Sequence, residues 1–500
     1  MTASICVVGA GATGIRLVER IRAHASAGPL DVHVVDPQAA GTAARGPSPD
    51  GLRVHAHRAG AVDLSGRFVL LDDGTRLDTG AVVLAQAWPD VLPSPREREL
   101  RDFARDHGLY YRPAGHAGGR PSLDRVAGGR PVLVLGLGAV MSGVVARLTT
   151  GRGGRFRPGR DGGPVYLPSG AEPVIHVGSP RGVPHHARHA YRTGGPPPSP
   201  RFVTALGPGP HDFRREVWPL VAKDLAYAYY HHLLTLHRDR ARMGWPGFAA
   251  AFAPEEWDGA AMRALIRAAV PRFEDRLTFA RLDRPLAGMR FGDLAGLQRW
   301  MHGYLSADLA RRADPAHSAD LAMIEGLRGV LDALAGRVPQ DAWLHRLARH
   351  AAGGLSATRI AELRALGRAG VLTFLGAAAR VDPSADGAWR ATSASVPGAV
   401  TATAFVDARR PAPSLDRTRD PLLRRLHDRG ECAEECGRLK VSLPGNRIVD
   451  SSGAAHPRRF ALGGWTTGAD PLSADDPPPL DALARAVLAA TAGPTVPRVA

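Results

Sequence analysis

The chain has 500 residues, of which 44% are hydrophobic, and a formal net charge of +16 at pH 7. That length suffices for two or three domains with cores of their own, and no apolar run reaches the roughly eighteen residues that a membrane span needs. Because the first predicted strand begins almost at the first residue, we expect no signal peptide and a cytoplasmic protein.

The positive charge is carried almost entirely by arginine, since Lys223 and Lys440 are the only lysines. The arginines are scattered along the chain and no nucleic-acid-binding module is recognisable, so we expect no nucleic acid as partner. The three cysteines, Cys6, Cys432 and Cys436, are too few for a disulfide framework and have no neighbours at metal-ligand spacing. We therefore expect no metal site.

The first element is predicted to be a dinucleotide-binding βαβ unit. An apolar run at residues 5–8 leads directly into a Gly-x-Gly-x-x-Gly turn, and a second run at residues 32–35 stops at Asp36. Such glycines permit a tight turn and close approach of a pyrophosphate, and an acid at that position accepts hydrogen bonds from a ribose. An ordinary glycine turn is the alternative. The spacing favours a bound dinucleotide, held by Gly9, Gly11, Gly14 and Asp36.

A β-meander is predicted after this unit. Residues 41–51 are rich in Gly, Pro, Ala and Ser and are expected to form a loop. Strands are predicted at residues 52–56, 67–71 and 81–84, with Asp72-Asp73-Gly74 as the hairpin between the last two. This arrangement suits the meander that many FAD domains carry before their last parallel strand.

A second nucleotide-binding unit is predicted in the middle of the first. The apolar run at residues 131–135 leads into Gly136 and Gly138, while Met141 occupies the place of the third small residue. A further run at residues 174–177 completes the βαβ pattern. The second copy is thus poorer than the first, and it is expected to bind a nicotinamide nucleotide.

Two polar residues follow the second strand of this copy. Ser179 and Arg181 lie where an NAD site carries its acid. A hydroxyl and a guanidinium suit a 2′-phosphate, which favours NADPH over NADH. The alternative is that Arg181 only closes a loop.

A helical region is predicted after a proline-rich break at residues 194–200. Apolar residues at three-and-four spacing predict helices at residues 216–236, 258–270, 294–312, 318–334 and 356–366. Strands at residues 371–376 and 404–408 are expected to return the chain to the first domain.

The last predicted element is a strand, a glycine turn and a helix. A strand at residues 459–462 precedes Gly463, Gly464 and Thr466, and a helix is expected at residues 480–490. In two-nucleotide flavoproteins such a turn brings backbone amides near the flavin ribityl and phosphate. A strand-loop-helix without cofactor contacts is the alternative.

Five sequence blocks carry a resemblance to a known family. They are residues 148–156, 166–173, 178–188, 218–224 with 229–230, and 406–411. They resemble the signature blocks of a bacterial FAD/NAD(P)-binding flavoprotein family that includes flavin-dependent amino-acid N-monooxygenases of secondary metabolism, the nitrosuccinate-forming aspartate oxidisers among them. The resemblance covers most of the chain. It implies FAD, NADPH and O₂, and an amine of a small amino-acid-derived substrate as the group oxidised.

The chain also departs from this family. Other members are longer after the acid of the second strand, where a segment lines the flavin and the substrate pocket, whereas here the loop at residues 41–51 leads almost directly to the meander. A trimmed FAD-binding accessory or scaffold protein is therefore the competing hypothesis, and an FAD oxidase or reductase is a lesser one.

Amine oxidation requires an unprotonated amine, a cation for any substrate carboxylate and exclusion of water. The candidate catalytic residues are Lys223, His185 and His186, and Arg188 is a candidate for the cofactor phosphate. A lysine retained in an arginine-rich chain can do what a guanidinium cannot. Lys223 can equally be present by chance, without a catalytic role, and both histidines can equally be solvated loop residues.

The expected fold class is α/β, with two Rossmann-like dinucleotide-binding domains. An FAD-binding domain is expected from residues 1–125 and 371–500, an NAD(P)H-binding domain at residues 126–200, and a helical subdomain at residues 201–370. A partner enzyme and a homo-oligomer both stay open as partners. No membrane partner is expected.

Overall fold

The computed structural model describes residues 3–26, 28–38, 51–86, 88–115, 122–160, 162–193, 195, 197–207, 209–335, 337–338, 341–410, 414–443, 445–468 and 480–491. The chain divides into two compact units. Unit 1 comprises Met1–Pro93, Gly115–Arg120 and Pro411–Ala500, and unit 2 comprises Ser94–Ala114 and Pro121–Arg410. The predicted loop at residues 41–51 lies, apart from Gly51, outside the described residues.

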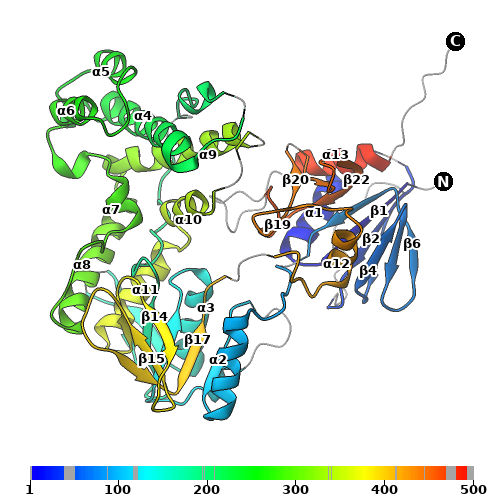
Figure 1. Ribbon diagram of the computed structural model, residues 1–500, viewed down its shortest axis with the longest axis horizontal. Helices are drawn as coiled ribbons and strands as arrows, with labels where there is room; N and C mark the ends of the chain where they lie inside the picture. Colours follow the sequence, from blue (N-terminus) through cyan, green and yellow to red (C-terminus); the bar gives the residue numbers. More distant parts are fainter. Residues whose placement is uncertain are drawn as a thin grey trace. The chain divides into compact units, whose positions relative to one another are not determined.

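Unit 1 is built on a seven-stranded sheet in the order β20-β21-β22-β7-β1-β2-β3 (Figure 1). The five strands from β22 to β3 are parallel, and β20 and β21 are antiparallel additions. The bounds are β1 (Ala3–Val8), β2 (Leu30–Val35), β3 (Leu52–His57), β7 (Ala81–Leu84), β20 (Val441–Ser442), β21 (Arg447–Val449) and β22 (Ala455–Ala461).

Strand β1 shows how this sheet is covered on both faces. Ile5 and Val7 pack toward helices α1 (Ala12–His24) and α13 (Leu480–Thr491). Cys6 and Val8, which alternate with them, pack in the core of the opposite face. That face is covered by α12 (Pro421–Asp428) and by a meander of β4 (Ala61–Ser65), β5 (Phe68–Leu71) and β6 (Arg76–Asp78), beside a small hairpin of β18 (Glu434–Glu435) and β19 (Arg438–Leu439).

The predicted hairpin is present but joins different strands. Asp72-Asp73-Gly74 connects β5 to β6, and β7 is instead a central parallel strand beside β1. The expectation that this hairpin joins residues 67–71 to residues 81–84 was therefore wrong. Strand β6 is only three residues long, with a single buried side chain, Leu77, so its alternation was too short to recognise.

Unit 2 is built on a five-stranded parallel sheet in the order β13-β12-β9-β17-β8. Its strands are β8 (Tyr110–Arg112), β9 (Pro131–Leu135), β12 (Val174–Gly178), β13 (Leu372–Phe374) and β17 (Ala404–Asp407). On one face of this sheet, the core includes residues of the helices α3 (Ala139–Leu148), α8 (Leu294–Ala313) and α11 (Ala357–Arg368). On the other face, the core includes residues of the helix α2 (Pro95–Asp106) and of a small sheet formed by β14 (Arg380–Pro383), β15 (Trp389–Thr392) and β16 (Val400–Ala402). A hairpin of β10 (Arg155–Pro158) and β11 (Pro164–Leu167) follows α3.

Two predicted strands belong to a different sheet from the one expected. Strands β13 and β17 pair with β12 and β9 in unit 2, and the chain returns to unit 1 only at Pro411. They do not close the first sheet. A short parallel strand is buried on both faces, so it has the same apolar sequence pattern in either sheet. Its sequence therefore does not identify the strand beside it.

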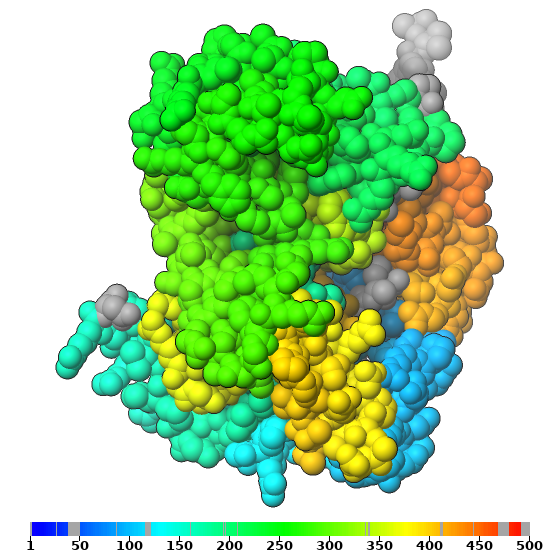
Figure 2. Space-filling model, turned by 60° about the vertical axis from the view of Figure 1, so that its left-hand side comes forward, coloured from blue at the N-terminus to red at the C-terminus, as the bar shows by residue number. Residues whose placement is uncertain are grey.

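The predicted helices are present. The helix α9 (Ser318–Leu334) has the predicted ends, and the others have shifted ends, as α4 (Trp218–Leu236), α6 (Ala260–Ala269), α8 and α11. The structure adds α2, α5 (Trp245–Phe252), α7 (Phe279–Asp283), α10 (Ala342–Ala351) and α12. Helix α8 contacts β13, and Phe291 before it donates a backbone hydrogen bond to Ser395. Figure 2 shows this neighbourhood on the surface, where the green of the helical segment lies against the yellow segment after β13.

The expected α/β class with parallel sheets is confirmed. The assignment of one nucleotide to each sheet stays a prediction. Within the residues described, no helix combines the length and apolar character that a membrane crossing requires.

Candidate functional site

The first glycine turn of unit 1 leaves open space above a helix N-terminus. Gly9 has a φ of +112°, and a Cβ there would lie 2.6 Å from the Gln86 backbone. A Cβ on Gly14 would lie 2.0 Å from the Gly9 carbonyl oxygen, so only glycine lets α1 pack this closely. A Cβ on Gly11, the N-cap of α1, would meet no atom of the described residues within 4 Å. A phosphate group can therefore approach the free amides at this end of α1.

Asp36 ties this turn to the second strand. Its Oδ2 accepts the Ala10 amide and its Oδ1 accepts the Gln38 amide, each at 2.8 Å. An ionised carboxylate has about four acceptor positions, so both oxygens keep lone pairs for the hydroxyls of a ribose. Asp36 therefore fits the predicted role.

The closing turn after β22 lies against the same part of unit 1. Gly463 has a φ of +128°, and the Trp465 indole donates to the Gln86 carbonyl at 3.1 Å. The Thr466 hydroxyl is buried and donates to the Gly463 carbonyl at 3.0 Å, so it holds the turn, and its predicted contact with a cofactor, like that of Gly464, stays a prediction.

Two buried polar atoms beside these turns bear on a bound ligand. Within the described residues, neither Oε1 of Gln86 nor the indole nitrogen of Trp88 has a hydrogen-bond partner. Buried polar atoms are seldom left unpaired in native proteins. Together with the open space at Gly11, they fit a bound dinucleotide such as FAD in unit 1.

The second glycine turn, in unit 2, is less open than the first. Gly136 has a φ of +124°, and a Cβ there would lie 2.7 Å from the Ala408 carbonyl oxygen. Gly138 is the N-cap of α3, but the His185 ring lies 3.6 Å from the place of its missing Cβ. Met141, the poor match in the sequence, is fully buried in the core. His185 therefore lies next to the place where a nucleotide phosphate is expected.

Ser179 and Arg181 are both engaged by other groups of unit 2. The Ser179 hydroxyl is buried and accepts the Gly182 amide at 3.0 Å. Arg181 donates from Nε and Nη2 to one carboxylate oxygen of Asp283, at 2.9 and 2.5 Å. Their predicted contact with a 2′-phosphate stays a prediction, and the sequence does not show that Asp283 packs against the end of β12.

The two candidate histidines lie in a cluster of buried polar residues. The His186 Nδ1 lies 2.6 Å from Asp308 Oδ1, and the His350 ring lies 4.7 Å from the His186 ring and 5.6 Å from the His185 ring. His350 is fully buried, and neither of its nitrogens has a partner within the described residues. Burial, with nearby Arg181 and Arg349, lowers the pKa of His185 to about 4. These histidines are shielded, not solvated.

Lys223 has a structural position. Its Nζ donates to the carbonyls of Ala253 and Glu255 at 2.7 and 2.6 Å, just beyond the C-terminal end of α5, and lies 4.3 Å from the centre of the Phe202 ring. Burial lowers its pKa. The structure thus does not place it among the histidines proposed with it. Arg188 is exposed and contacts the Gly353 carbonyl at 3.4 Å.

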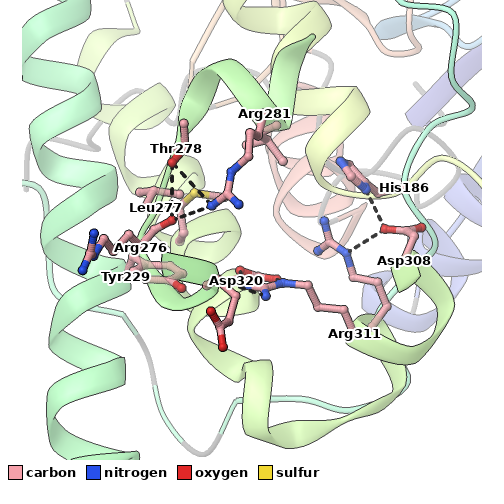
Figure 3. Close-up of a pocket in the computed structure, with 13 residues that line it drawn as sticks. His186, Tyr229, Arg276, Leu277, Thr278, Arg281, Asp308, Arg311 and Asp320 are labelled. Atoms are coloured by element: carbon pink, nitrogen blue, oxygen red, sulfur yellow. Dashed lines mark hydrogen bonds and ion pairs between the residues drawn. The ribbon is translucent and has the colours of Figure 1, made fainter. Parts of the chain in front are cut away.

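A pocket of about 240 Å³ lies within unit 2, beside the histidine cluster (Figure 3). Arg311 donates from two nitrogens to Asp320, so this pair is neutral. Arg281 enters from α7, and its described hydrogen bonds reach the Arg276 carbonyl at 3.0 Å and the Thr278 hydroxyl at 3.5 Å, neither of which is anionic. A guanidinium with only neutral partners suits a carboxylate on a small ligand.

The sequence did not reveal Asp283, Asp308 or His350 as neighbours of the predicted residues. Each lies more than a hundred residues from the side chain or turn that it meets. Gln86 did follow a recognised strand, but only the structure shows its backbone beneath Gly9.

Comparison with curated proteins gives three close relatives. The chain is 34% identical over 466 residues to the nitrosuccinate-forming L-aspartate N-monooxygenase of Streptomyces davaonensis, covering 83% of this chain and 71% of that protein. The enzyme of the same name from Streptomyces cremeus is 34% identical over 90% of this chain and 75% of its own. Nitrosuccinic acid synthase of Aspergillus oryzae is 33% identical over 89% and 74%. No family model matches.

Solved structures are less similar. The covalent putidaredoxin reductase–putidaredoxin complex has a TM-score of 0.20 and 14% identity, over 35% of this chain and 42% of that one. Reduced CoADR-RHD of Bacillus anthracis has a TM-score of 0.33 and 9% identity, over 99% of this chain and 58% of that one. Superpositions this poor support no argument about function.

Proposed function

The chain belongs to the family of flavin-dependent amino-acid N-monooxygenases, and we propose that it uses FAD and a nicotinamide nucleotide to oxidise the amine of L-aspartate or a close relative of it. The predicted family and the predicted amine-oxidising monooxygenase activity are confirmed by the three relatives. The cofactors, the substrate and the residues that bind them are the proposal.

The observation that carries the flavin part is the first glycine turn. The open space at Gly11, the ribose-facing acid Asp36 and the unpartnered Oε1 of Gln86 are the features expected of a dinucleotide site. When bound there, FAD reduced by a nicotinamide nucleotide supplies the activation of O₂ that no amino-acid side chain provides. The turns of unit 1 then bind and orient it.

The substrate part of the proposal is supported by the relatives' names and by charge in unit 2. Two relatives are named for L-aspartate, which carries two carboxylates. The pocket of Figure 3 presents the Arg281 guanidinium, whose described partners are neutral. We propose that this pocket accepts a carboxylate of the substrate.

His186 is the side chain proposed to exchange a proton with the ligand amine. The pKa of Asp308 is raised by burial but lowered more by the His186 hydrogen bond and by Arg312, so it is held below its usual range. An ionised Asp308 only accepts, so Nδ1 of His186 carries the proton of this hydrogen bond, and Nε2 is the nitrogen proposed to exchange a proton. The tautomer is thus assigned from the hydrogen bond.

The test is product analysis with the purified chain, FAD and NADPH in ¹⁸O₂. The proposal predicts that L-aspartate yields an N-oxygenated product carrying ¹⁸O, whereas succinate, which lacks the amine, yields none. Bound FAD with no oxygenated product from any amino acid would favour the accessory-protein hypothesis, which the short loop at residues 41–51 motivates.

A further inference from the structure

The end of strand β12 carries a paired charge that bears on the choice of nicotinamide nucleotide. Arg181 donates from Nε to the carbonyl and to Oδ1 of Asp283, both at 2.9 Å, and from Nη2 to Oδ1 at 2.5 Å. The Trp343 indole donates to Oδ2 at 3.0 Å. The side chains of Arg181 and Asp283 are only 18% and 9% exposed. Asp283, the last residue of α7, is thus fixed against the end of β12.

This pair lies where a βαβ nucleotide site recognises the adenosine ribose. The carbonyl of Gly178, the last residue of β12, accepts the amide of Gly136 in the glycine turn at 2.7 Å. The residues directly after such a strand face the ribose 2′ position. Because the Ser179 hydroxyl is buried and accepts the Gly182 amide, Arg181 is the main group left for a 2′-phosphate.

Asp283 is ionised at neutral pH. Burial alone would raise its pKa, but the hydrogen bonds from Arg181 and Trp343 outweigh burial and hold the pKa below its usual range. A 2′-phosphate that approaches Arg181 must therefore displace a carboxylate and bear its repulsion, whereas the 2′-hydroxyl of NADH does neither.

We propose that Asp283 is a specificity-determining residue, which competes with the 2′-phosphate of NADPH for Arg181 and so narrows the preference for NADPH over NADH. This inference rests on the proposed function only in that a nicotinamide nucleotide binds at Gly136 and Gly138. It needs neither the flavin nor the amine substrate.

A second cation shares Asp283. The Arg284 Nε lies 3.5 Å from Asp283 Oδ2, and the Arg284 side chain is 71% exposed. Removal of the Asp283 charge therefore leaves two guanidiniums without this counter-charge at the end of β12, and both can attract a phosphate dianion.

The decisive experiment measures calorimetric Kd values of the full-length chain for NADP⁺ and NAD⁺, without substrate. Asp283→Asn keeps the size of the side chain and removes its charge. We expect the ratio Kd(NAD⁺)/Kd(NADP⁺) to rise about tenfold, with Kd(NAD⁺) little changed, because the repulsion between the Asp283 carboxylate and the 2′-phosphate is removed. Asp239→Asn, the same change at an exposed position of unit 2, should leave the ratio unchanged.

Arg181→Gln shows whether the gain depends on the freed guanidinium. The Arg181→Gln/Asp283→Asn double variant should show a smaller rise in the ratio over Arg181→Gln than Asp283→Asn shows over the wild type, because only Arg284 and the lost repulsion then act on the phosphate. A ratio unchanged in Asp283→Asn, or a rise of the same size with and without Arg181, overturns the inference.

A second variant covers the case in which Asp283→Asn fails to fold. Arg284→Glu changes an exposed side chain and adds negative charge at the same place, so it should lower the ratio, and an unchanged ratio overturns the inference. If neither nucleotide binds the wild type, the nicotinamide part of the proposed function fails as well. If the wild type binds both nucleotides and these variants leave the ratio of Kd values unchanged, only the inference about Asp283 is overturned.

Discussion

The His186 Nδ1 lies 2.6 Å from Oδ1 of Asp308, and the same carboxylate accepts the Ala187 amide at 2.8 Å from its other oxygen. Arg312, whose side chain is 4% exposed, places its Nε 3.6 Å from Oδ1. Asp308 is therefore the counter-charge of a buried guanidinium as well as the partner that orients a histidine. Loss of its charge affects both.

Asp308→Asn should lower the free energy of unfolding by about 3 kcal/mol, because a buried charge is left without its partner. Urea denaturation of the full-length chain measures the loss. The matched control is Asp102→Asn, which breaks the exposed pair with Arg105 and should change little. Equal losses in both variants would contradict the role given to Asp308.

Lys223→Met should destabilise the protein by about 2 kcal/mol, since two backbone carbonyls lose a charged donor. The amine-oxidising turnover per folded molecule should stay within about twofold of the wild type. The measurement pairs a denaturation curve with turnover normalised to folded protein. A variant of full stability whose turnover is abolished would restore Lys223 as a catalytic residue.

The sequence predicted the parallel sheets and the first glycine turn because each is a local pattern. An apolar run, a glycine turn and an acid lie within about forty residues, and their spacing alone implies the geometry at Gly9 and Asp36. The helices of unit 2 were likewise visible from their own periodicity.

Pairings between distant segments could not be predicted in the same way. The carboxylate of Asp283 neutralises Arg181, although the two residues are about a hundred positions apart in the sequence. Similarly, the sequence of β13 does not show which of the two sheets it joins. Lys223 was proposed as a catalytic residue because lysine is rare in this chain. A rare residue can equally bind the carbonyls at the end of a helix, and only the contacts with the carbonyls of Ala253 and Glu255 show that Lys223 has this second role.

Stability should fall on mild acidification. Burial lowers the pKa of His185 to about 4, that of His189 to about 3 and that of His350 well below its ordinary value of 6.5. The folded state holds these rings neutral, so their contribution is complete above pH 6.5 and is lost as the pH falls toward 4. Unfolding midpoints in urea between pH 7.5 and 4.5 test this.

His350→Leu should flatten that pH dependence, because one of the groups that gain a proton on unfolding is removed. His107→Gln, which changes an exposed histidine, is the control and should leave the slope intact. A slope that is the same in all three proteins would show that the buried histidines do not cause the acid sensitivity.

Gly11→Ala and Gly14→Ala should separate cofactor binding from folding. A methyl group at residue 11 would meet no atom within 4 Å in the part of the chain that the structure describes, whereas one at residue 14 would lie 2.0 Å from the Gly9 carbonyl oxygen. Gly11→Ala should therefore fold and lose FAD affinity at least tenfold, since the methyl occupies the approach of the pyrophosphate. Gly14→Ala should lower the thermal midpoint of the apoprotein. Circular dichroism and FAD titration distinguish them, and unaltered FAD affinity in Gly11→Ala would contradict the site.

Arg281→Gln should weaken L-aspartate binding about tenfold, since a charge-assisted hydrogen bond to a carboxylate contributes roughly 1.5–3 kcal/mol. Arg267→Gln removes the same charge from an exposed position on α6 and should have no effect. Calorimetry with L-aspartate and with its monoamide L-asparagine makes the comparison. Unchanged aspartate affinity in Arg281→Gln would place the substrate carboxylates elsewhere.

The visible spectrum of the purified chain with FAD, recorded before and after anaerobic addition of NADPH or NADH and again in air, tests the central claim most directly. The account predicts a bound flavin that is bleached by a nicotinamide nucleotide and regains its colour in air. A bound flavin that neither nucleotide reduces would contradict the monooxygenase account. Failure to bind FAD at all would contradict the site built from Gly9, Gly11, Gly14 and Asp36.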